Sequence, residues 1–151
     1  MILFDLPDEA ATAALAARIA ALARKGDVIA LRGDLGAGKT CFARAFIRAL
    51  GDAEEEVPSP TFTLVQVYRP GIWHFDLYRL RAPEEAWELG IEEAFADGIA
   101  LIEWPERLGA LLPRERLDVG LAFADLPQAR CAALDAGSEW RERLAGIVLD
   151  A

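Results

Sequence analysis

The fold is decided by the stretch Gly33-Asp34-Leu35-Gly36-Ala37-Gly38-Lys39-Thr40. It matches the phosphate-binding pattern G-x-x-x-x-G-K-[ST] at every fixed position. The glycines allow the backbone to curl so that several N–H groups face one anion. Lys39 can then reach the outer phosphates of a nucleotide, and the Thr40 hydroxyl can bind Mg²⁺. The stretch therefore predicts a nucleotide-binding loop, the alternative being a glycine-rich turn that holds no ligand.

The residues on either side of this loop supply the setting that the pattern requires. Residues 28–31 (Val-Ile-Ala-Leu) form an apolar run that is typical of a buried strand. Residues 41–48 have the spacing of an amphipathic helix, which we expect to begin at about Lys39 and to end at Gly51. The N-terminus of that helix adds the positive end of its dipole to the loop.

Composition limits the size, location and partners of the protein. A chain of 151 residues is enough for one domain with a core, and no second-domain boundary is visible. No apolar run approaches the about 20 residues of a membrane span, and the N-terminal residues lack the basic start of a signal peptide. We therefore expect a cytoplasmic protein without a membrane segment. Cys41 and Cys131 are expected to be reduced thiols.

The charge of the chain bears on its contact with nucleic acid. The formal net charge is −9, whereas proteins that grip a phosphate backbone cluster Lys and Arg on one surface. Any contact with RNA is therefore expected to run through a partner.

The remaining pattern predicts further strands and helices on both sides of the loop. Leu15, Ile19 and Leu22 share one face of the first helix, which is expected to pack on the sheet. The expected elements are an edge strand at 1–6, a helix from about 7 to 23, an antiparallel hairpin of strands 63–68 and 72–78, helices at 83–89 and 91–95, a buried strand at 99–102, a short helix or turn at 107–112, strands at 117–123 and 129–134, and a helix from Ser138 to about Leu144.

The strand at 72–78 carries the first candidate acid. Its residues alternate between an expected core face and an expected polar face, namely Trp73, Phe75 and Leu77 against His74, Asp76 and Tyr78. Asp76 is a candidate for the carboxylate that holds Mg²⁺, usually through water. The alternative is an ion pair with Arg79 or Arg81 at a strand edge. His74 is expected to be a neutral, hydrogen-bonded imidazole rather than a catalytic one.

A second candidate acid, Glu103, follows the apolar run 99–102, which is typical of a strand covered on both faces. Open α/β sheets bind ligands at the carboxyl ends of their strands, which is also the edge of the phosphate loop. Glu103 is therefore expected to point toward the nucleotide. In a hydrolysis reaction, Lys39 and Mg²⁺ would neutralise charge on the γ-phosphate while Glu103 or Asp76 orients the attacking water.

Other residues indicate which kinds of nucleotide-binding protein are disfavoured. The chain contains no asparagine, so the Asn-Lys-x-Asp element of guanine recognition is absent and a GTPase is disfavoured. Its arginines are scattered rather than gathered in a substrate lid, which disfavours a small-molecule kinase. A binding module that uses the nucleotide only as a conformational ligand stays open. Trp104 can stack on a base or cap the core, and Trp73 and Trp87 are expected to lie in the core.

Three further segments occur with the loop in a characteristic order and spacing. They are residues 59–65 (Ser-Pro-Thr-Phe-Thr-Leu-Val), 74–80 (His-Phe-Asp-Leu-Tyr-Arg-Leu) and 102–106 (Ile-Glu-Trp-Pro-Glu). Together with residues 33–40 they resemble the bacterial TsaE (YjeE) family, the ATPase component of tRNA threonylcarbamoyladenosine biosynthesis. The resemblance covers roughly residues 7–107.

The resemblance implies a fold and an activity. The fold would be a single P-loop NTPase-like domain over residues 1–151, a three-layer α/β/α sandwich around a mixed, largely parallel central sheet. The protein would bind ATP and Mg²⁺ and hydrolyse ATP slowly by itself. It would dock onto homologues of TsaD and TsaB, which attach threonylcarbamoyl to the adenosine beside the anticodon of tRNAs that read ANN codons. It would meet tRNA only indirectly.

The resemblance also implies roles for individual residues. Thr40, Asp76 and Glu103 would hold or approach the metal, and the nucleotide would contact a larger set: the loop residues Gly33 to Thr40, then Cys41, Thr61, Trp104, and in the base pocket Glu9, beside Asp8, and Arg130. Ser59 and Thr61 would belong to a segment that responds to the γ-phosphate. One departure is visible, because Cys41 stands where the family commonly has a second threonine. The backbone N–H remains, but a hydroxyl contact is lost and the thiol could make the site sensitive to oxidation.

Overall fold

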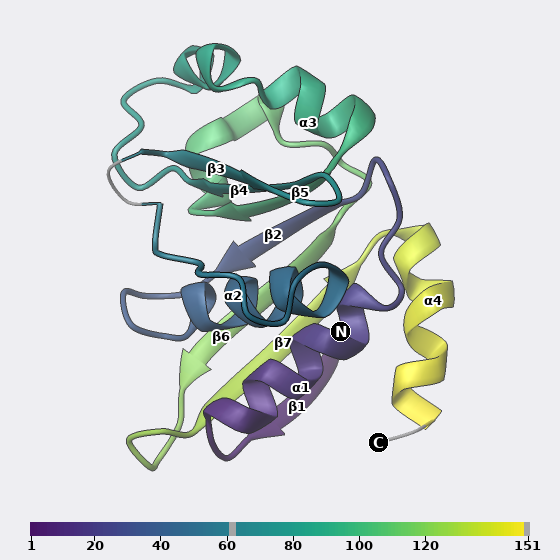
Figure 1. Cartoon of the computed structure of the whole chain (residues 1–151). Coiled ribbons are helices and arrows are strands. Elements are labelled where there is room, and N and C mark those ends of the chain that lie inside the picture. The colour runs from purple at the N-terminus through teal and green to yellow at the C-terminus, as the bar shows by residue number, and fades with distance from the viewer. Residues whose placement is uncertain (61–62, 150–151) are drawn as a thin grey trace.

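The computed structural model describes residues 1–60 and 63–149, and within these ranges seven strands form one mixed sheet (Figure 1). The order across the sheet is β1-β7-β6-β2-β5-β4-β3. The bounds are Ile2–Leu6 for β1, Val28–Arg32 for β2, Val65–Tyr68 for β3, Ile72–Asp76 for β4, Ile99–Glu103 for β5, Leu117–Phe123 for β6 and Arg130–Ala136 for β7.

Parallel pairing is confined to the centre of the sheet. Strand β2 pairs in parallel with β6 on one side and β5 on the other, and β5 pairs in parallel with β4. The outer pairs, β3 with β4, β6 with β7 and β1 with β7, are antiparallel. The predicted mixed α/β sheet, the hairpin before the apolar strand and the edge strand at the N-terminus are therefore confirmed.

Two groups of helices cover the sheet, one on each face. Alternate residues of the central strands enter different cores: Ile29 and Leu101 join one apolar cluster, whereas Val28 joins the other. The first cluster contains residues of α1 (Glu9–Ala20), α2 (Lys39–Leu50) and α4 (Ser138–Leu149), and the second contains residues of η1 (Pro83–Leu89), α3 (Ile91–Asp97) and η2 (Pro105–Leu111). The α/β/α layering follows from strands that are apolar on both faces.

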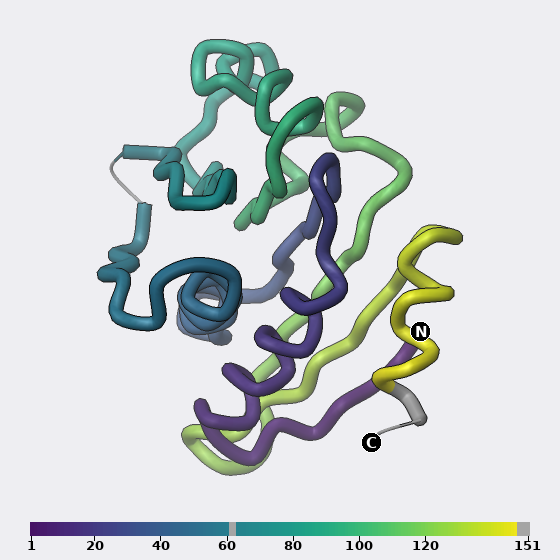
Figure 2. The backbone as a smooth tube through the Cα atoms, turned by 45° about the vertical axis from the view of Figure 1, so that its right-hand side comes forward, coloured from purple at the N-terminus to yellow at the C-terminus, as the bar shows by residue number. Residues whose placement is uncertain are grey.

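The second helical layer is incomplete. Its core contacts are with β2, β4 and β5, while Leu3 of β1 keeps 73% of its surface exposed and Cys131 of β7 is also exposed. Helix α4 lies near the start of β1 in both views of the backbone (Figures 1 and 2). The half of the sheet that carries the phosphate loop on β2 is therefore the half packed on both sides.

Several sequence expectations differ from the structure, including the first helix, which ends at Ala20, and the strand at 72–78, which ends at Asp76. Trp87 is 46% exposed rather than in the core, because η1 turns the neighbouring Ala86 inward. The C-terminal helix extends past Leu144, since Trp140, Leu144 and Ile147 continue one buried stripe. Strand β3 begins only at Val65, after Leu64 takes a left-handed backbone with φ of 68°. None of the helices in the described ranges is long and apolar enough to cross a membrane.

Candidate nucleotide-binding site

The phosphate loop lies between β2 and α2, as the pattern predicts. Gly38 takes a φ of +111° immediately before Lys39, the first residue of α2, a conformation that side chains rarely adopt. A Cβ atom at Gly33 would stand 2.5 Å from the Leu121 carbonyl oxygen of β6, so the start of the loop can pass the neighbouring strand only as glycine. These two glycines give the loop the tight, amide-lined shape that a phosphate requires.

Lys39 is buried, with 5% of its surface exposed, and its ammonium group lies within the loop. The Nζ atom donates to the Gly33 carbonyl and lies 3.5 Å from the Asp34 carbonyl oxygen. It also stands 3.8 Å from the ring centroid of Trp104. Burial lowers the pKa of Lys39, and the nearby carboxylates of Glu103 and Asp76 act in the opposite direction.

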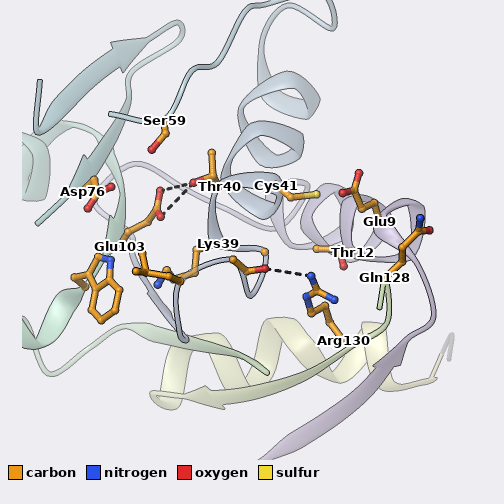
Figure 3. Close-up of a pocket in the computed structure, with 14 residues that line it drawn as sticks. Glu9, Thr12, Lys39, Thr40, Cys41, Ser59, Asp76, Glu103, Gln128 and Arg130 are labelled. Atoms are coloured by element: carbon orange, nitrogen blue, oxygen red, sulfur yellow. Dashed lines mark hydrogen bonds between the residues drawn. The ribbon is translucent and has the colours of Figure 1, made fainter. Parts of the chain in front are cut away.

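Two acids from neighbouring strands face the first turn of α2. Asp76 and Glu103 are direct partners in the parallel register of β4 and β5, and they are 5% and 3% exposed. The Thr40 hydroxyl donates toward the Glu103 carboxylate, with Oγ1 3.3 Å from Oε1 and 3.4 Å from Oε2 (Figure 3). Asp76 lines the same pocket, and its Oδ1 accepts the Tyr78 backbone N–H at 3.1 Å. Glu103 therefore lies at the edge of the phosphate loop, as expected, and Asp76 lies beside it, while the role of either acid in holding Mg²⁺ stays a prediction.

The polar face of β4 is as deeply buried as its apolar face. His74 is fully buried, and its Nε2 atom lies 2.7 Å from Oε2 of Glu103. The expected hydrogen bond of this histidine is thus confirmed, and its partner is one of the two candidate acids.

Trp104 follows Glu103 and takes a left-handed backbone with φ of 60°. Such a conformation is costly for a large side chain and is found where surrounding structure enforces it, often at functional sites. Its indole packs against the Tyr78 ring, with centroids 4.9 Å apart, as well as against Lys39. Its packing against the second core cluster agrees with the expected capping of the core. Trp104 also lines the pocket, and its stacking on a base stays a prediction.

The other end of the pocket is closed by Arg130 of β7, which holds the tip of the loop. Its Nη2 donates to the Gly36 carbonyl at 3.1 Å (Figure 3). Its Nε donates to the Ala37 carbonyl, also at 3.1 Å. Its Nη1 donates to the Pro127 and Ala129 carbonyls, and the guanidinium lies 4.7 Å from the Phe123 ring centroid. The guanidinium of Arg130 therefore binds the loop backbone. Arg130 also lines the pocket, where a contact with the base was expected.

Cys41 lines the pocket as a free thiol, and Cys131 is also free. Burial raises the pKa of the Cys41 thiol, and the Glu9 carboxylate adds to this effect. Because the thiolate is the reactive form, the environment disfavours rapid oxidation of Cys41. The sensitivity of the site to oxidation, expected from the sequence, stays a prediction, and the raised pKa predicts that the reaction is slow.

The pocket brings together most of the residues that the sequence singled out. Those that line it are Glu9, Leu35, Gly36, Gly38, Lys39, Thr40, Cys41, Ser59, Asp76, Glu103, Trp104 and Arg130. Three loop residues, Gly33, Asp34 and Ala37, are not among the lining residues. Asp8 is not either, because its carboxylate caps α1 by accepting the Ala11 N–H at 2.8 Å. Thr61 lies outside the described residues.

Two further lining residues escaped the sequence analysis. Thr12 is 2% exposed and occupies the same helix face as Leu15 and Ile19, so a threonine within that apolar stripe was the available signal. Gln128 lies in the loop between β6 and β7, where no local pattern distinguishes it.

The donor set bears on the kind of metal that the site could hold. Among residues 1–60 and 63–149, no group of three or more His, Cys, Asp or Glu side chains is arranged to hold a metal ion alone. Mg²⁺ usually takes only one or two carboxylates and completes its shell with water and substrate phosphates. The Thr40 hydroxyl beside the Glu103 carboxylate fits that pattern.

Comparison with known proteins identifies the family. The family described as "Threonylcarbamoyl adenosine biosynthesis protein TsaE" matches residues 6–130, which include the loop, both acids and Arg130. The chain belongs to the TsaE family. The match ends before α4, the helix whose residues complete the first core cluster.

Individual TsaE proteins are similar over most of their length. The protein named tRNA threonylcarbamoyladenosine biosynthesis protein TsaE from Rickettsia felis is 40% identical over 137 residues, which cover 89% of this chain and 80% of that protein. The protein of the same name from Bacillus subtilis is 43% identical over 117 residues, covering 75% and 71%. The crystal structure of Bacillus subtilis YdiB superposes with a TM-score of 0.82 at 30% identity and covers 99% of this chain and 95% of that one.

Proposed function

We propose that this protein binds ATP with Mg²⁺ and hydrolyses it, as an accessory enzyme in forming threonylcarbamoyladenosine on tRNA. Family membership supports the place in tRNA modification. The nucleotide chemistry is supported by one arrangement above all: Lys39 within a glycine-bent loop, followed by Thr40 against the Glu103 carboxylate. A positive group, a hydroxyl and an acid at the N-terminus of one helix are the parts that phosphoryl transfer needs.

The chain's own groups would divide the work of holding the triphosphate. Backbone N–H groups at the start of α2 bind the phosphate oxygens, aided by the helix dipole. In the structure, Nζ of Lys39 donates to loop carbonyls. When ATP binds, it would donate to the outer phosphates instead. Trp104 packs over the ammonium and keeps water from it.

The acids would act beside the same outer phosphates. Thr40, with Glu103 and Asp76 close by, holds Mg²⁺ directly or through water. The ion supplies neutralisation of the charge that develops on the phosphates. Glu103 orients the attacking water, and Ser59 on the facing segment responds to the γ-phosphate.

The partners in this proposal are homologues of TsaD and TsaB, with tRNA reached only through them. A net charge of −9 supports that division, since the chain itself would repel a phosphate backbone. Hydrolysis would then support repeated cycles of the partner complex rather than perform the transfer of the threonylcarbamoyl group.

The proposal is tested by binding and turnover together. Calorimetry should detect ATP uptake by the wild-type protein in Mg²⁺, and Lys39→Ala should weaken it by about 100-fold, the order of a lost charge-assisted contact. Release of inorganic phosphate should rise when the TsaD–TsaB pair is added. Absence of ATP uptake by the wild type would overturn the proposal.

Two further results would favour the other functions. Multiple rounds of tRNA modification with a non-hydrolysable ATP analogue would indicate a nucleotide-responsive binding module. Transfer of labelled phosphate to a metabolite, without release of inorganic phosphate, would indicate a small-molecule kinase.

A further inference from the structure

His74 is a fully buried titratable side chain for which the proposed function has no task. It lies on β4 two residues before Asp76, on the same face of the strand. Its Nε2 atom is 2.7 Å from Oε2 of Glu103. This contact is shorter than the two that the same carboxylate makes with the Thr40 hydroxyl, which measure 3.3 and 3.4 Å.

The second ring nitrogen identifies the tautomer. Nδ1 of His74 is buried and has no hydrogen-bond partner within the described part of the chain. A buried N–H donor without an acceptor is costly, so a proton on Nδ1 would be unfavourable there. With its proton on Nε2, the ring instead donates to Glu103 and leaves only a lone pair unmatched. Of the two tautomers, the geometry therefore selects the one that is protonated at Nε2.

This bond restricts the carboxylate that faces Thr40. A glutamate side chain has three rotatable bonds, and a strong contact to Oε2 removes freedom that would otherwise be lost on binding. The parallel register places His74 opposite Leu101 and Asp76 opposite Glu103. The imidazole therefore contacts the Glu103 carboxylate from a position two residues before the strand partner of Glu103. Oε1 is thereby kept at the hydroxyl of Thr40.

We propose that His74 is a positioning residue, which holds the Glu103 carboxylate in the orientation that receives the metal-bound or attacking water. The role rests on the proposed function for its catalytic consequence, but the hydrogen bond and the tautomer do not. A residue that only filled space would need no donor at this position.

The first test concerns the bond itself and needs no nucleotide. His74 is the single histidine of the chain, so nitrogen-15 NMR at neutral pH reports one imidazole. The expected spectrum has a protonated Nε2 and an unprotonated Nδ1. A proton on Nδ1, or the averaged shifts of a ring that exchanges between tautomers, would overturn the proposal even if the protein proves to hydrolyse ATP.

The second test compares three variants in ATP binding and turnover. His74→Gln keeps an N–H donor near the place of Nε2, and His74→Leu removes it. Ile72→Ala is the matched control, because Ile72 is buried on the same face of β4 but belongs to the packing of the first core cluster. Thermal unfolding shows that each variant is folded at the assay temperature.

The expected pattern separates positioning from packing. His74→Leu should lower kcat about tenfold, the order of a misplaced catalytic group, with KM changed less than about twofold. It should also reduce the gain in ATP affinity that Mg²⁺ gives over EDTA in calorimetry. His74→Gln should recover most of both quantities, and Ile72→Ala should lower the melting temperature without lowering kcat.

Equal kcat values for His74→Leu and the wild type would overturn the positioning role. So would equal losses in His74→Gln and His74→Leu, or a matching loss of kcat in Ile72→Ala. Failure of the proposed function would look different, since the wild type itself would then take up no ATP while the NMR result could still stand.

Discussion

Two buried carboxylates, Asp27 and Glu103, lie at opposite ends of the central strands, and their hydrogen-bond partners differ in kind. Asp27 precedes β2 at the amino end of the central strands and is 8% exposed, while Glu103 ends β5 at their carboxyl end and is 3% exposed. Burial of a carboxylate is costly unless hydrogen bonds compensate it. The two acids meet that requirement with different kinds of partner.

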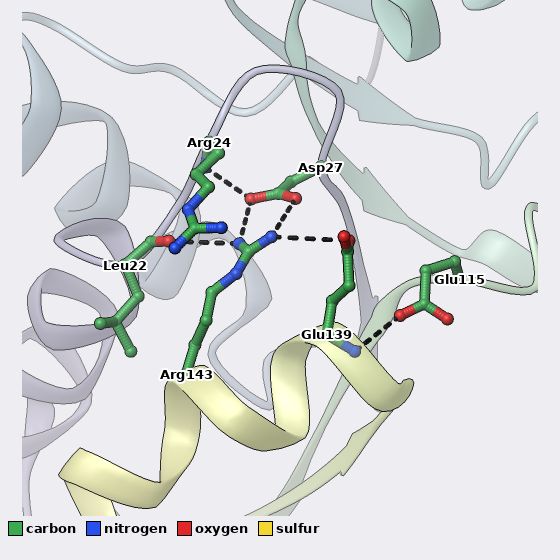
Figure 4. Close-up of polar contacts among 6 residues, drawn as sticks. All are labelled: Leu22, Arg24, Asp27, Glu115, Glu139 and Arg143. Atoms are coloured by element: carbon green, nitrogen blue, oxygen red, sulfur yellow. Dashed lines mark hydrogen bonds and ion pairs between the residues drawn. The ribbon is translucent and has the colours of Figure 1, made fainter.

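Asp27 is enclosed by fixed donors (Figure 4). Its Oδ2 accepts the Arg24 backbone N–H and Nη1 of Arg143 at 2.6 Å, and its Oδ1 accepts Nη2 of Arg143 at 3.1 Å. Arg143 also donates to the Leu22 carbonyl at 3.2 Å, and the bond to Asp27 raises the pKa of the guanidinium. This closed cluster ties α4 to the turn between α1 and β2.

Glu103 instead meets His74 on one side and the weakly held hydroxyl of Thr40 on the other, at the wall of a pocket. Its partners leave room for a ligand to replace the longer bonds. A buried carboxylate whose oxygens all accept short hydrogen bonds from fixed donors has a structural role, as at Asp27. A carboxylate with longer hydrogen bonds at a pocket wall, as at Glu103, can exchange them for bonds to a ligand.

The largest expected effect comes from opening the closed cluster. Asp27→Ala should lower the free energy of unfolding by about 3–5 kcal/mol, because the Arg143 charge is left buried without its partner. Urea denaturation measures this loss, and ATP affinity should change less than about twofold, since the lost contacts are remote from the loop. The double variant Asp27→Leu with Arg143→Leu should recover much of the stability. A loss of ATP affinity that parallels the loss of stability would contradict the comparison.

Glu103→Gln tests the other side of the comparison. The amide keeps the shape and one acceptor oxygen but not the charge, so ATP turnover should fall about 100-fold while stability changes by less than about 1 kcal/mol. Phosphate release and thermal unfolding measure the two effects. Glu106→Gln is the control, because that half-exposed acid lies at the same edge and pairs with Arg32. Full turnover in Glu103→Gln would argue that Asp76 alone serves the reaction.

The Arg130→Met variant tests whether Arg130, whose guanidinium donates to backbone carbonyls of the loop, has a structural role in the pocket or a chemical one. Loss of the hydrogen bonds to Gly36 and Ala37 frees the tip of the loop, and ATP affinity should drop about tenfold, or about 1.4 kcal/mol. Arg130→Lys keeps the charge but not the fork, so calorimetry should find it nearly as weak. Wild-type affinity in Arg130→Lys would show that charge alone suffices.

The smallest effect concerns the reactivity of Cys41. Because burial and Glu9 raise the pKa of this thiol, a smaller fraction is thiolate at any given pH, and alkylation should set in at higher pH than for a free cysteine. A Cys131→Ser background isolates the signal, which mass spectrometry measures against pH. ATP with Mg²⁺ should slow the labelling further, since Cys41 lines the pocket. Rapid labelling at neutral pH would be the contrary result.

Much of the fold could be predicted because its signals are local. The apolar run that became β5, the hairpin of β3 and β4 and the helix start at Lys39 were all expected within a few residues. The prediction that Trp87 lies in the core was wrong. Which residues of η1 are buried depends on how that helix packs on the sheet, and the local sequence does not show this. Gln128 carried no signal, because a loop residue becomes part of a pocket only through the path of the chain around it.

The glycine pattern and the apolar periodicity are sufficient to indicate the loop at residues 33–40, the family and the succession of strands, since both act over a few neighbouring residues. Three long-range contacts became visible only in the folded chain: Thr40 with Glu103 across 63 positions, His74 with Glu103 across 29, and Arg130 with the loop across 93. Such contacts depend on strand register and packing, in which each side chain competes with every other for the same space.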